Sequence, residues 1–365
     1  MLASISAVGL GIVMATEGFA TSGTGDKSQE STRFARVFSD HMVLQRKQPI
    51  RVWGRAQAGA ELTVALAGES KSIETDADGN WQVDLTALPA GGPHVLSLHD
   101  ENGLVQSVND VLIGDVWLCS GQSNMEVPVG EVNLGHAQPS KTPGTIRLMT
   151  VAHDSRVTPQ SDFAIAPGWS VADANSIPGF SAVCYLLAYE LQKTHDIPFG
   201  MIKSAWGGSG IKTWIGAREL KRTGNFDREL SWLDTYANDK KQANIQFGQA
   251  WEQWWGRVNP KGGQPWKESA HQSFEWTRSP AKMGNWKMFG DPELANHHGM
   301  VWFRKTFDLS SEQADKGAVL ALGGIDEVDY LWVNGRFIGS TFGYGTERFY
   351  DLPPGVLRTG TNSIT

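Results

Sequence analysis

The sequence predicts an α/β protein in which a domain of buried strands and helices lies between two regions of β-strands. Residues 33–112 alternate short strands and turns. Near-continuous apolar runs follow at Val111–Cys119 and Pro198–Trp206, and strand patterns return after His298. An apolar run of this kind is typical of a strand buried on both faces of a parallel sheet. A length of 365 residues suits two or three such domains.

The first 30 residues predict an export signal and a linker that take no part in the fold. The apolar stretch Leu2–Met14 is shorter than the roughly 20 residues that span a bilayer, and the small residues Gly18 and Ala20 suit a cleavage site. Thr21–Ser31 is polar and rich in Gly, Ser and Thr, as linkers are. The alternative is an unstructured N-terminus, because the usual positive residues are missing. The expected location is periplasmic or secreted, with no membrane span.

Residues 31–112 are expected to form a small β-sandwich. Ile50–Trp53, Glu61–Leu66 and Trp81–Leu85 alternate apolar and polar residues, and the turn residues Asp78–Asn80 precede the last of them. Short strands with turns between them are typical of such a sandwich.

The α/β domain is predicted over residues 113–296. Ile146–Val151 is a further buried run, and Ser181–Gln192 places apolar residues at the spacing of one helix face, with Ser181 as the N-cap. The order strand, helix, strand predicts a parallel sheet. Residues 297–365 then return to β structure, with a hairpin at Asn334-Gly335.

The composition argues against several functions. The net charge of −7 and the lack of a basic cluster disfavour a nucleic-acid partner. Cys119 and Cys184 cannot make a disulfide framework and are interpreted as small core residues. His297 and His298 point to opposite faces of an extended segment, so they are not expected to share a metal ion. No metal site is therefore predicted.

A serine-containing turn follows the first buried run directly. Ser120–Met125 reads SGQSNM, and a serine on a tight turn at the carboxyl end of a central strand is where an α/β hydrolase exposes its nucleophile. Trp206–Gly210 (WGGSG) follows another buried strand. Both turns would lie at one edge of a parallel sheet and offer backbone N–H groups to an oxyanion. The alternative is a pair of flexible glycine turns without a catalytic role.

These segments resemble the bacterial sialate O-acetylesterase family, a branch of the SGNH hydrolases. The resemblance rests on Gly114–Met125 (GDVWLCSGQSNM) and Trp206–Trp214 (WGGSGIKTW), flanked by Ser39–Gln45 (SDHMVLQ) and Trp332–Gly339 (WVNGRFIG). It implies an SGNH-type, flavodoxin-like parallel sheet, preceded by the small β-sandwich. It also implies an incomplete jelly-roll β-sandwich at 297–365, similar to the sugar-binding domain of β-galactosidase-like enzymes. The implied activity removes acetyl groups from sugar hydroxyls without a metal or organic cofactor.

The resemblance also implies the roles of five residues. Ser123 would be the nucleophile, and the N–H groups of Ser123 and of Gly207 or Gly208 would stabilise the oxyanion. Gln122 and Asn124 would be neighbours in the active site.

The general base is unknown from this sequence. The family uses a histidine in an Asp-x-x-His pair, and none of the nine histidines here has an aspartate three residues before it. His271, three residues after Glu268, is the nearest approach. The family's Gln-Gly-Glu block is also absent. A serine without a base is a weak nucleophile, so the chain is expected to be carboxyl-truncated and to have little or no esterase activity.

Two other functions stay open. One is a non-catalytic carbohydrate-binding protein with a degenerate hydrolase domain, and the other is a lipase- or thioesterase-like enzyme on the same fold. Ser231–Trp286 is rich in tryptophan and polar residues, which favours a sugar over an acyl chain. These tryptophans have two interpretations, as packing between domains or as an aromatic wall for a sugar ring. An acetylated carbohydrate is the expected substrate.

Overall fold

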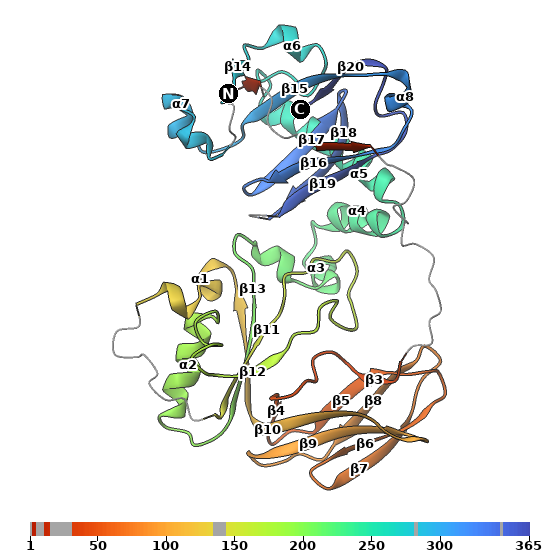
Figure 1. The fold of residues 1–365 in the computed structure, drawn as a ribbon, viewed down its shortest axis with the longest axis vertical. Helices are drawn as coiled ribbons and strands as arrows, with labels where there is room; N and C mark the ends of the chain where they lie inside the picture. The colour runs from red at the N-terminus through yellow and green to blue at the C-terminus, as the bar shows by residue number, and fades with distance from the viewer. Residues whose placement is uncertain (1, 5–10, 15–30, 134–143, 281–283, 344–345) are drawn as a thin grey trace. The chain divides into compact units, whose positions relative to one another are not determined.

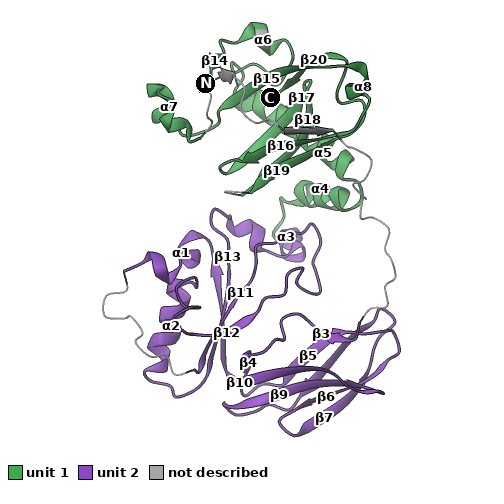
Figure 2. Ribbon diagram, in the orientation of Figure 1, with its two compact units in different colours: residues 1–23, 223–365 green, residues 24–222 purple. Residues whose placement is uncertain are grey.

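The computed structural model describes residues 2–4, 11–14, 31–133, 144–280, 284–343 and 346–365 (Figure 1). They form two compact units, coloured in Figure 2. Unit 2 is Thr24–Arg222, and unit 1 combines Met1–Gly23 with Thr223–Thr365. The predicted α/β class is confirmed, since the chain combines helices with several β-sheets. The units divide the chain inside the predicted 113–296 domain, and the sequence-based domain ranges stay a prediction.

The first part of unit 2 consists of strands that enclose one hydrophobic core. The strands are β3 (Arg33–Phe34), β4 (Val43–Gln45), β5 (Ile50–Arg55), β6 (Glu61–Leu66), β7 (Glu69–Glu74), β8 (Asn80–Leu85), β9 (Gly91–Asp100) and β10 (Gly103–Gly121). β3, β5 and β8 form one sheet, while β6, β7, β9 and β10 belong to a larger one. Inward residues of both sheets, such as Val52, Leu62 and Leu96, are buried together. The alternating pattern of the sequence therefore gives strands with one buried and one open face.

The second part of unit 2 continues from the same long strand β10 (Figure 1). The carboxyl half of β10 pairs in parallel with β13 (Phe199–Ala205), and β13 pairs in parallel with β11 (Ile146–Thr150). β12 (Trp169–Val171) adds an antiparallel edge strand. The short helices here are α1 (Ser123–Glu126), η1 (Val129–Glu131), η3 (Ile211–Trp214) and α3 (Ala217–Thr223). The apolar runs of the sequence are thus neighbouring strands whose carboxyl ends meet at one edge.

Helix α2 (Ala182–Gln192) packs against β13. It begins as predicted, because the Ser181 hydroxyl accepts a hydrogen bond from the Cys184 backbone N–H at 3.2 Å. The face with Ala182, Tyr185 and Ala188 is buried.

Cys119 and Cys184 form a disulfide, which corrects the interpretation of them as separate core residues. Both are buried as expected, at 6% and 1% exposure. The packing of α2 against β13, the strand next to β10, brings the two Cα atoms to 5.9 Å, within disulfide range, although the cysteines lie 65 residues apart in the sequence. The bond ties α2 to the end of β10, just before Ser123.

Unit 1 combines helices with two sheets. Its helices are α4 (Asp227–Asn238), α5 (Lys240–Val258), α6 (Ala270–Ser273), η4 (Trp286–Met288), α7 (Pro292–Ala295) and α8 (Ser311–Ala314). Its strands are β1 (Leu2–Ser4), β2 (Gly11–Met14), β14 (Thr277–Arg278), β15 (Trp302–Leu309), β16 (Ala318–Gly324), β17 (Val328–Val333), β18 (Arg336–Phe342), β19 (Glu347–Leu352) and β20 (Gly360–Ile364). The predicted hairpin joins β17 to β18, and Asn334 and Gly335 both have the positive φ that its turn requires.

The described residues of the N-terminal segment take part in this unit, which differs from the sequence-based expectation. β1 lies between β14 and β15, and β2 pairs with the edge of β16. Exposed strand edges accept such short apolar segments readily through backbone hydrogen bonds. The predicted cleavage site at Gly18 and Ala20 lies outside the described residues, as does most of the predicted linker. The export signal therefore stays a prediction.

The tryptophans of Ser231–Trp286 largely serve packing within unit 1. Trp251 of α5 and Trp266 are buried in one cluster with Trp302 and Trp332 of the sheet. Trp254, on the same helix, is 42% exposed. For Trp251 and Trp266 the structure therefore favours the packing interpretation over an aromatic wall.

A charged cluster joins the two parts of unit 2. The buried Arg147 of β11 bonds both carboxylate oxygens of Asp110, at 2.5 and 3.2 Å. His41 Nδ1 lies 2.7 Å from the same carboxylate. The hydrogen bond from Arg147, assisted by His41, lowers the pKa of Asp110 below its usual value.

Replacing Asp110 with asparagine is expected to lower the free energy of unfolding at pH 7 by about 1–3 kcal/mol, because it leaves Arg147 without its charge partner. Asparagine tolerates the positive φ of Asp110, so the backbone is preserved. The folded-state pKa is below the unfolded value of about 3.9, so the stabilisation is present above that pH and lost as the pH falls through the folded-state pKa. Urea unfolding should show the two proteins converge in acid.

The matched control is Asp84→Asn, which removes the exposed ion pair with Arg51 on β5. Little change is expected because solvent screens exposed pairs. An Asp110→Asn protein as stable as the unsubstituted chain at pH 7 would refute a stabilising role for the cluster.

Candidate functional site

Ser123 stands where the chain turns from strand to helix. β10 ends at Gly121, Gln122 is the N-cap residue, and Ser123 is the first residue of α1. A Cβ on Gly121 would lie 3.2 Å from Met125 Cβ, so a side chain there would crowd the turn. The turn leaves Ser123 exposed at the carboxyl end of β10.

The glycine turn after β13 lies against Ser123, as the shared sheet edge predicts. Gly121 and Ala205 are register partners at the ends of β10 and β13, and Trp206 N–H donates to Gly121 O at 3.1 Å. A Cβ on Gly207 would lie 3.7 Å from both Cα and Cβ of Ser123. The structure therefore brings together the two turns that the sequence singled out.

Two residues that the sequence analysis missed hold these turns together. Glu126, at the end of α1, accepts a hydrogen bond from Gly207 N–H to Oε2 at 2.6 Å. Its Oε1 lies 2.7 Å from Nε2 of His153. The His153 ring stacks on Trp206, with centroids 4.4 Å apart and planes 2° apart. Glu126 thus links the serine turn, the glycine turn and the segment that follows β11.

The surroundings of His153 decide which of its ring nitrogens carries a proton. Nε2 faces the Glu126 carboxylate and also the carbonyl oxygen of Ala205, at 3.1 Å. Both groups are hydrogen-bond acceptors, so Nε2 is the protonated nitrogen. That nitrogen donates to them, and Nδ1 is left as the proton acceptor of the ring.

The backbone N–H groups of the two turns differ in availability. Gly207 N–H is bonded to Glu126. Of the residues that the structure describes, none accepts a hydrogen bond from the N–H of Ser123 or of Gly208. Gly208 has φ +76°, a conformation that favours glycine.

The remaining predicted residues are placed as follows. Gln122 and Asn124 flank Ser123 and are exposed, and Gln122 Oε1 accepts a long hydrogen bond of 3.4 Å from Ser123 Oγ. His271 belongs to α6 in unit 1, whereas Ser123 belongs to unit 2.

A signal for the missed residues was present in the sequence. Glu126 follows Ser123 by one helical turn, and His153 follows the buried run Ile146–Val151. The carboxyl end of this third parallel strand lies at the same sheet edge as the other two, so a residue that follows it is expected near Ser123.

Within the described ranges, no group of three or more His, Cys, Asp or Glu side chains is arranged to hold a metal ion. No helix in those ranges has both the length and the apolar character needed to cross a membrane.

Comparisons with known proteins cover both units. Residues 264–365 match the family described as the second all-β domain of β-galactosidase. Sialate O-acetylesterase from Rattus norvegicus is 33% identical over 210 residues, covering 53% of this chain and 39% of that protein. The Homo sapiens sialate O-acetylesterase is 33% identical over 212 residues, covering 53% and 40%. The chain thus spans about two fifths of the length of these relatives. A carbohydrate acetylesterase structure from Xanthomonas citri has 21% identity and a TM-score of 0.49, covering 90% of this chain and 92% of that one.

Proposed function

We propose that this chain, which is related to the sialate O-acetylesterases, carries the nucleophile of a carbohydrate O-acetylesterase. The observation that carries the proposal is the contact between the two turns, with Gly207 placed against Ser123 at the carboxyl ends of β10 and β13. That placement is where enzymes with open parallel sheets bind and attack substrates. The relatives' names support an acetylated sugar as the substrate class.

In the proposed reaction, Ser123 Oγ attacks the carbonyl carbon of an acetyl ester. The bond between that carbon and the sugar oxygen breaks, and the sugar leaves as an alcohol after gaining the proton that the Ser123 hydroxyl gives up. Water then cleaves the acetyl–serine bond, which releases acetate and restores the Ser123 hydroxyl. The N–H groups of Ser123 and Gly208 are the proposed oxyanion donors. The bond from Gly207 N–H to Glu126 supports Gly208 over Gly207 in this role.

Glu126 is proposed as a positioning residue. It does not approach the acetyl group in this reaction, but it holds the glycine turn at 2.6 Å and His153 at 2.7 Å. Because α1 contains both Ser123 and Glu126, this contact fixes the nucleophile relative to the oxyanion donors.

Turnover by this chain is expected to be low. A general base must reach the Ser123 hydroxyl, and in the described parts of the chain that hydroxyl bonds only the Gln122 amide oxygen. An amide oxygen is too weak a base to take the proton. Within the described residues, His153 bonds Glu126 and Ala205 and makes no hydrogen bond to that hydroxyl.

We infer the finer fold and the location on similar grounds. The parallel order β10, β13, β11 supports an SGNH-type, flavodoxin-like sheet, and the family match over 264–365 supports a jelly-roll related to β-galactosidase domains. The Cys119–Cys184 disulfide supports a periplasmic or secreted location, where such bonds persist.

Replacing Glu126 with alanine is expected to slow covalent labelling of Ser123 by a fluorophosphonate about 10–100-fold, because the glycine turn loses its anchor. Glu126→Gln keeps an acceptor for Gly207 N–H and should stay within a few-fold of the unsubstituted chain. Mass spectrometry of the labelled protein against time gives both rates. Glu131→Ala, a nearby exposed glutamate, is the control and should label normally. Equal labelling rates for the Glu126→Ala and Glu126→Gln variants would refute a positioning role for Glu126.

Acetate release from O-acetylated sialic acid, compared between the chain and its Ser123→Ala variant, tests the function itself. Slow release that depends on Ser123 is the expected result. Sugar binding without any release or serine labelling would instead favour the non-catalytic carbohydrate-binding protein, and faster cleavage of long-chain acyl esters would favour a lipase.

A further inference from the structure

We propose that Trp214 is the platform on which the sugar ring of the ester rests while the acetyl group reaches Ser123. The inference rests on the esterase function proposed above, and it adds the residue that selects a sugar as the alcohol part of the substrate. Trp214 is the last residue of η3, which begins directly after the glycine turn of residues 206–210.

A chain of hydrogen bonds fixes the Trp214 ring beside a proposed oxyanion donor. Its Nε1–H donates to Ser209 Oγ at 2.9 Å, and that hydroxyl donates to Trp206 O at 2.6 Å. Ser209 is the residue that follows Gly208. Trp206 N–H donates in turn to Gly121 O, just before the serine turn. The ring is therefore held by the same glycine turn that lies against the nucleophile.

Backbone hydrogen bonds make η3 a firm support for the ring. The carbonyl oxygen of Gly210, its N-cap residue, accepts from the N–H and from the hydroxyl of Thr213, at 3.1 and 2.7 Å. Ile215 N–H donates to Lys212 O at 3.3 Å and closes the last turn. A side chain fixed through both its backbone and its ring nitrogen loses little freedom when a ligand binds.

The exposed apolar surface of η3 extends beyond the tryptophan. Ile211 is 75% exposed, Trp214 40% and Ile215 38%. Residues three apart in a 3₁₀ helix lie above one another, so Ile211 and Trp214 share a face. Single exposed apolar side chains are common, but a contiguous group beside a candidate active site indicates a surface that binds a ligand.

The openness of this surface favours a sugar ring over a long acyl chain. An indole face packs against the C–H groups on one side of a pyranose ring, while hydroxyls on the other side stay in water. An acyl chain gains most where a groove encloses it, and residues 210–218 are all exposed. Because the acetyl group is small, the sugar is the part of the ester that extends past the turn.

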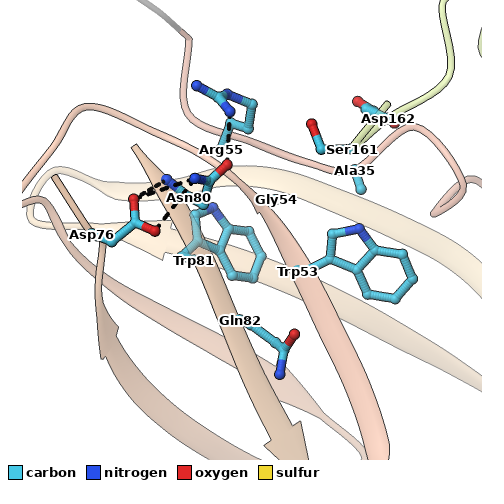
Figure 3. Close-up of a pocket in the computed structure, with 10 residues that line it drawn as sticks. All are labelled: Ala35, Trp53, Gly54, Arg55, Asp76, Asn80, Trp81, Gln82, Ser161 and Asp162. Atoms are coloured by element: carbon cyan, nitrogen blue, oxygen red, sulfur yellow. Dashed lines mark hydrogen bonds between the residues drawn. The ribbon is translucent and has the colours of Figure 1, made fainter. Parts of the chain in front are cut away.

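Trp53, also in unit 2, offers a matched control (Figure 3). It is 36% exposed, close to the value for Trp214, and the hollow that it lines contains neither Ser123 nor the glycine turn. Polar groups of that hollow bond one another, as Asn80 N–H does with Asp76 Oδ1 at 2.8 Å. Trp53→Ala therefore removes an indole of similar exposure that is not part of the candidate site.

Binding of O-acetylated sialic acid to the Ser123→Ala chain, which should not hydrolyse it, tests the platform by itself. Chemical shifts of the sugar against protein concentration give the dissociation constant. An additional Trp214→Ala substitution should weaken binding about 10-fold or more, because the ring face is lost. Trp214→Phe keeps a flat ring and should stay within about 3-fold of its parent. Trp53→Ala should bind as its parent does.

A ratio of two reactions gives a readout that a merely structural role would not move. O-acetylated sialic acid and diisopropyl fluorophosphate should both react at Ser123, but only the first carries a sugar. Trp214→Ala should lower kcat/KM for the sugar ester, divided by the labelling rate, about 10-fold or more. Damage to the fold would lower both rates alike. Circular dichroism of each variant checks that it folds.

Failure of this inference can be told apart from failure of the proposed function. A folded Trp214→Ala protein that binds the sugar ester as tightly as its parent overturns the platform, even where Ser123 takes the label. An unchanged ratio of the two reactions also overturns it, since Trp214 would then be structural only. A Ser123 that takes no label overturns the esterase function, and the binding titration still decides whether Trp214 holds the sugar.

Discussion

A Ser123→Ala protein is expected to take up no fluorophosphonate label and to lose its ester hydrolysis, with a fall in labelling rate of at least about 1,000-fold. The substitution removes the oxygen that attacks and leaves the turn unchanged, since Ser123 Oγ makes only a long 3.4 Å hydrogen bond to Gln122. Intact-mass measurement after incubation with the probe gives the extent of labelling, and peptide mapping gives its position.

The same motif provides a matched control. Ser120 is also exposed and lies three residues before Ser123, within β10. Ser120→Ala should label at the normal rate. If the Ser120 variant lost labelling and the Ser123 variant kept it, the nucleophile would be misassigned.

Removing the disulfide is expected to lower the free energy of unfolding by about 4 kcal/mol, because the bond closes a loop of 65 residues in the unfolded chain. A Cys119→Ser, Cys184→Ser double variant should therefore unfold at a markedly lower urea concentration. The bond also fixes the end of β10 to α2, so labelling of Ser123 should slow in the same protein.

A reducing agent supplies the control for this prediction. Dithiothreitol should shift the unsubstituted chain to the stability of the double variant and leave the double variant unchanged. Equal stability of the oxidised and reduced chains would show that the bond contributes nothing measurable to folding.

Local patterns predicted much of the fold. Apolar runs marked the buried parts of β10, β11 and β13, and the apolar spacing after Ser181 marked α2. The Asn334-Gly335 pair marked a turn whose two positive φ angles few other residues adopt. These features depend on neighbours in the sequence, so a single sequence contains them.

Two features that depend on contacts between distant residues were not predicted. The Cys119–Cys184 bond depends on the packing of α2 against β13, the neighbour of β10, and a count of two cysteines carries no such information. The pairing of β1 and β2 with other strands likewise depends on edges that form only in the folded chain.

The candidate site was likewise predicted only in part from the sequence. The sequence placed Ser123 and the glycine turn at one sheet edge, because parallel strands end together. It left Gly207 and Gly208 as alternatives, and atomic contacts were needed to find that Glu126 engages the Gly207 N–H. His153 follows β11, the third parallel strand, so its place in the site follows only when β11 is counted as part of the same sheet edge.

The central claim is that Ser123 Oγ is the oxygen that attacks the ester. Acetyl transfer from p-nitrophenyl acetate tests this claim most directly. This ester has a good leaving group, so acylation needs little help from a base, whereas deacylation does need one. Acetyl–Ser123 should therefore accumulate and be found by peptide mass spectrometry in the unsubstituted chain and not in Ser123→Ala. Acetate release with an unmodified Ser123, or with the acetyl group on another residue, would contradict the account.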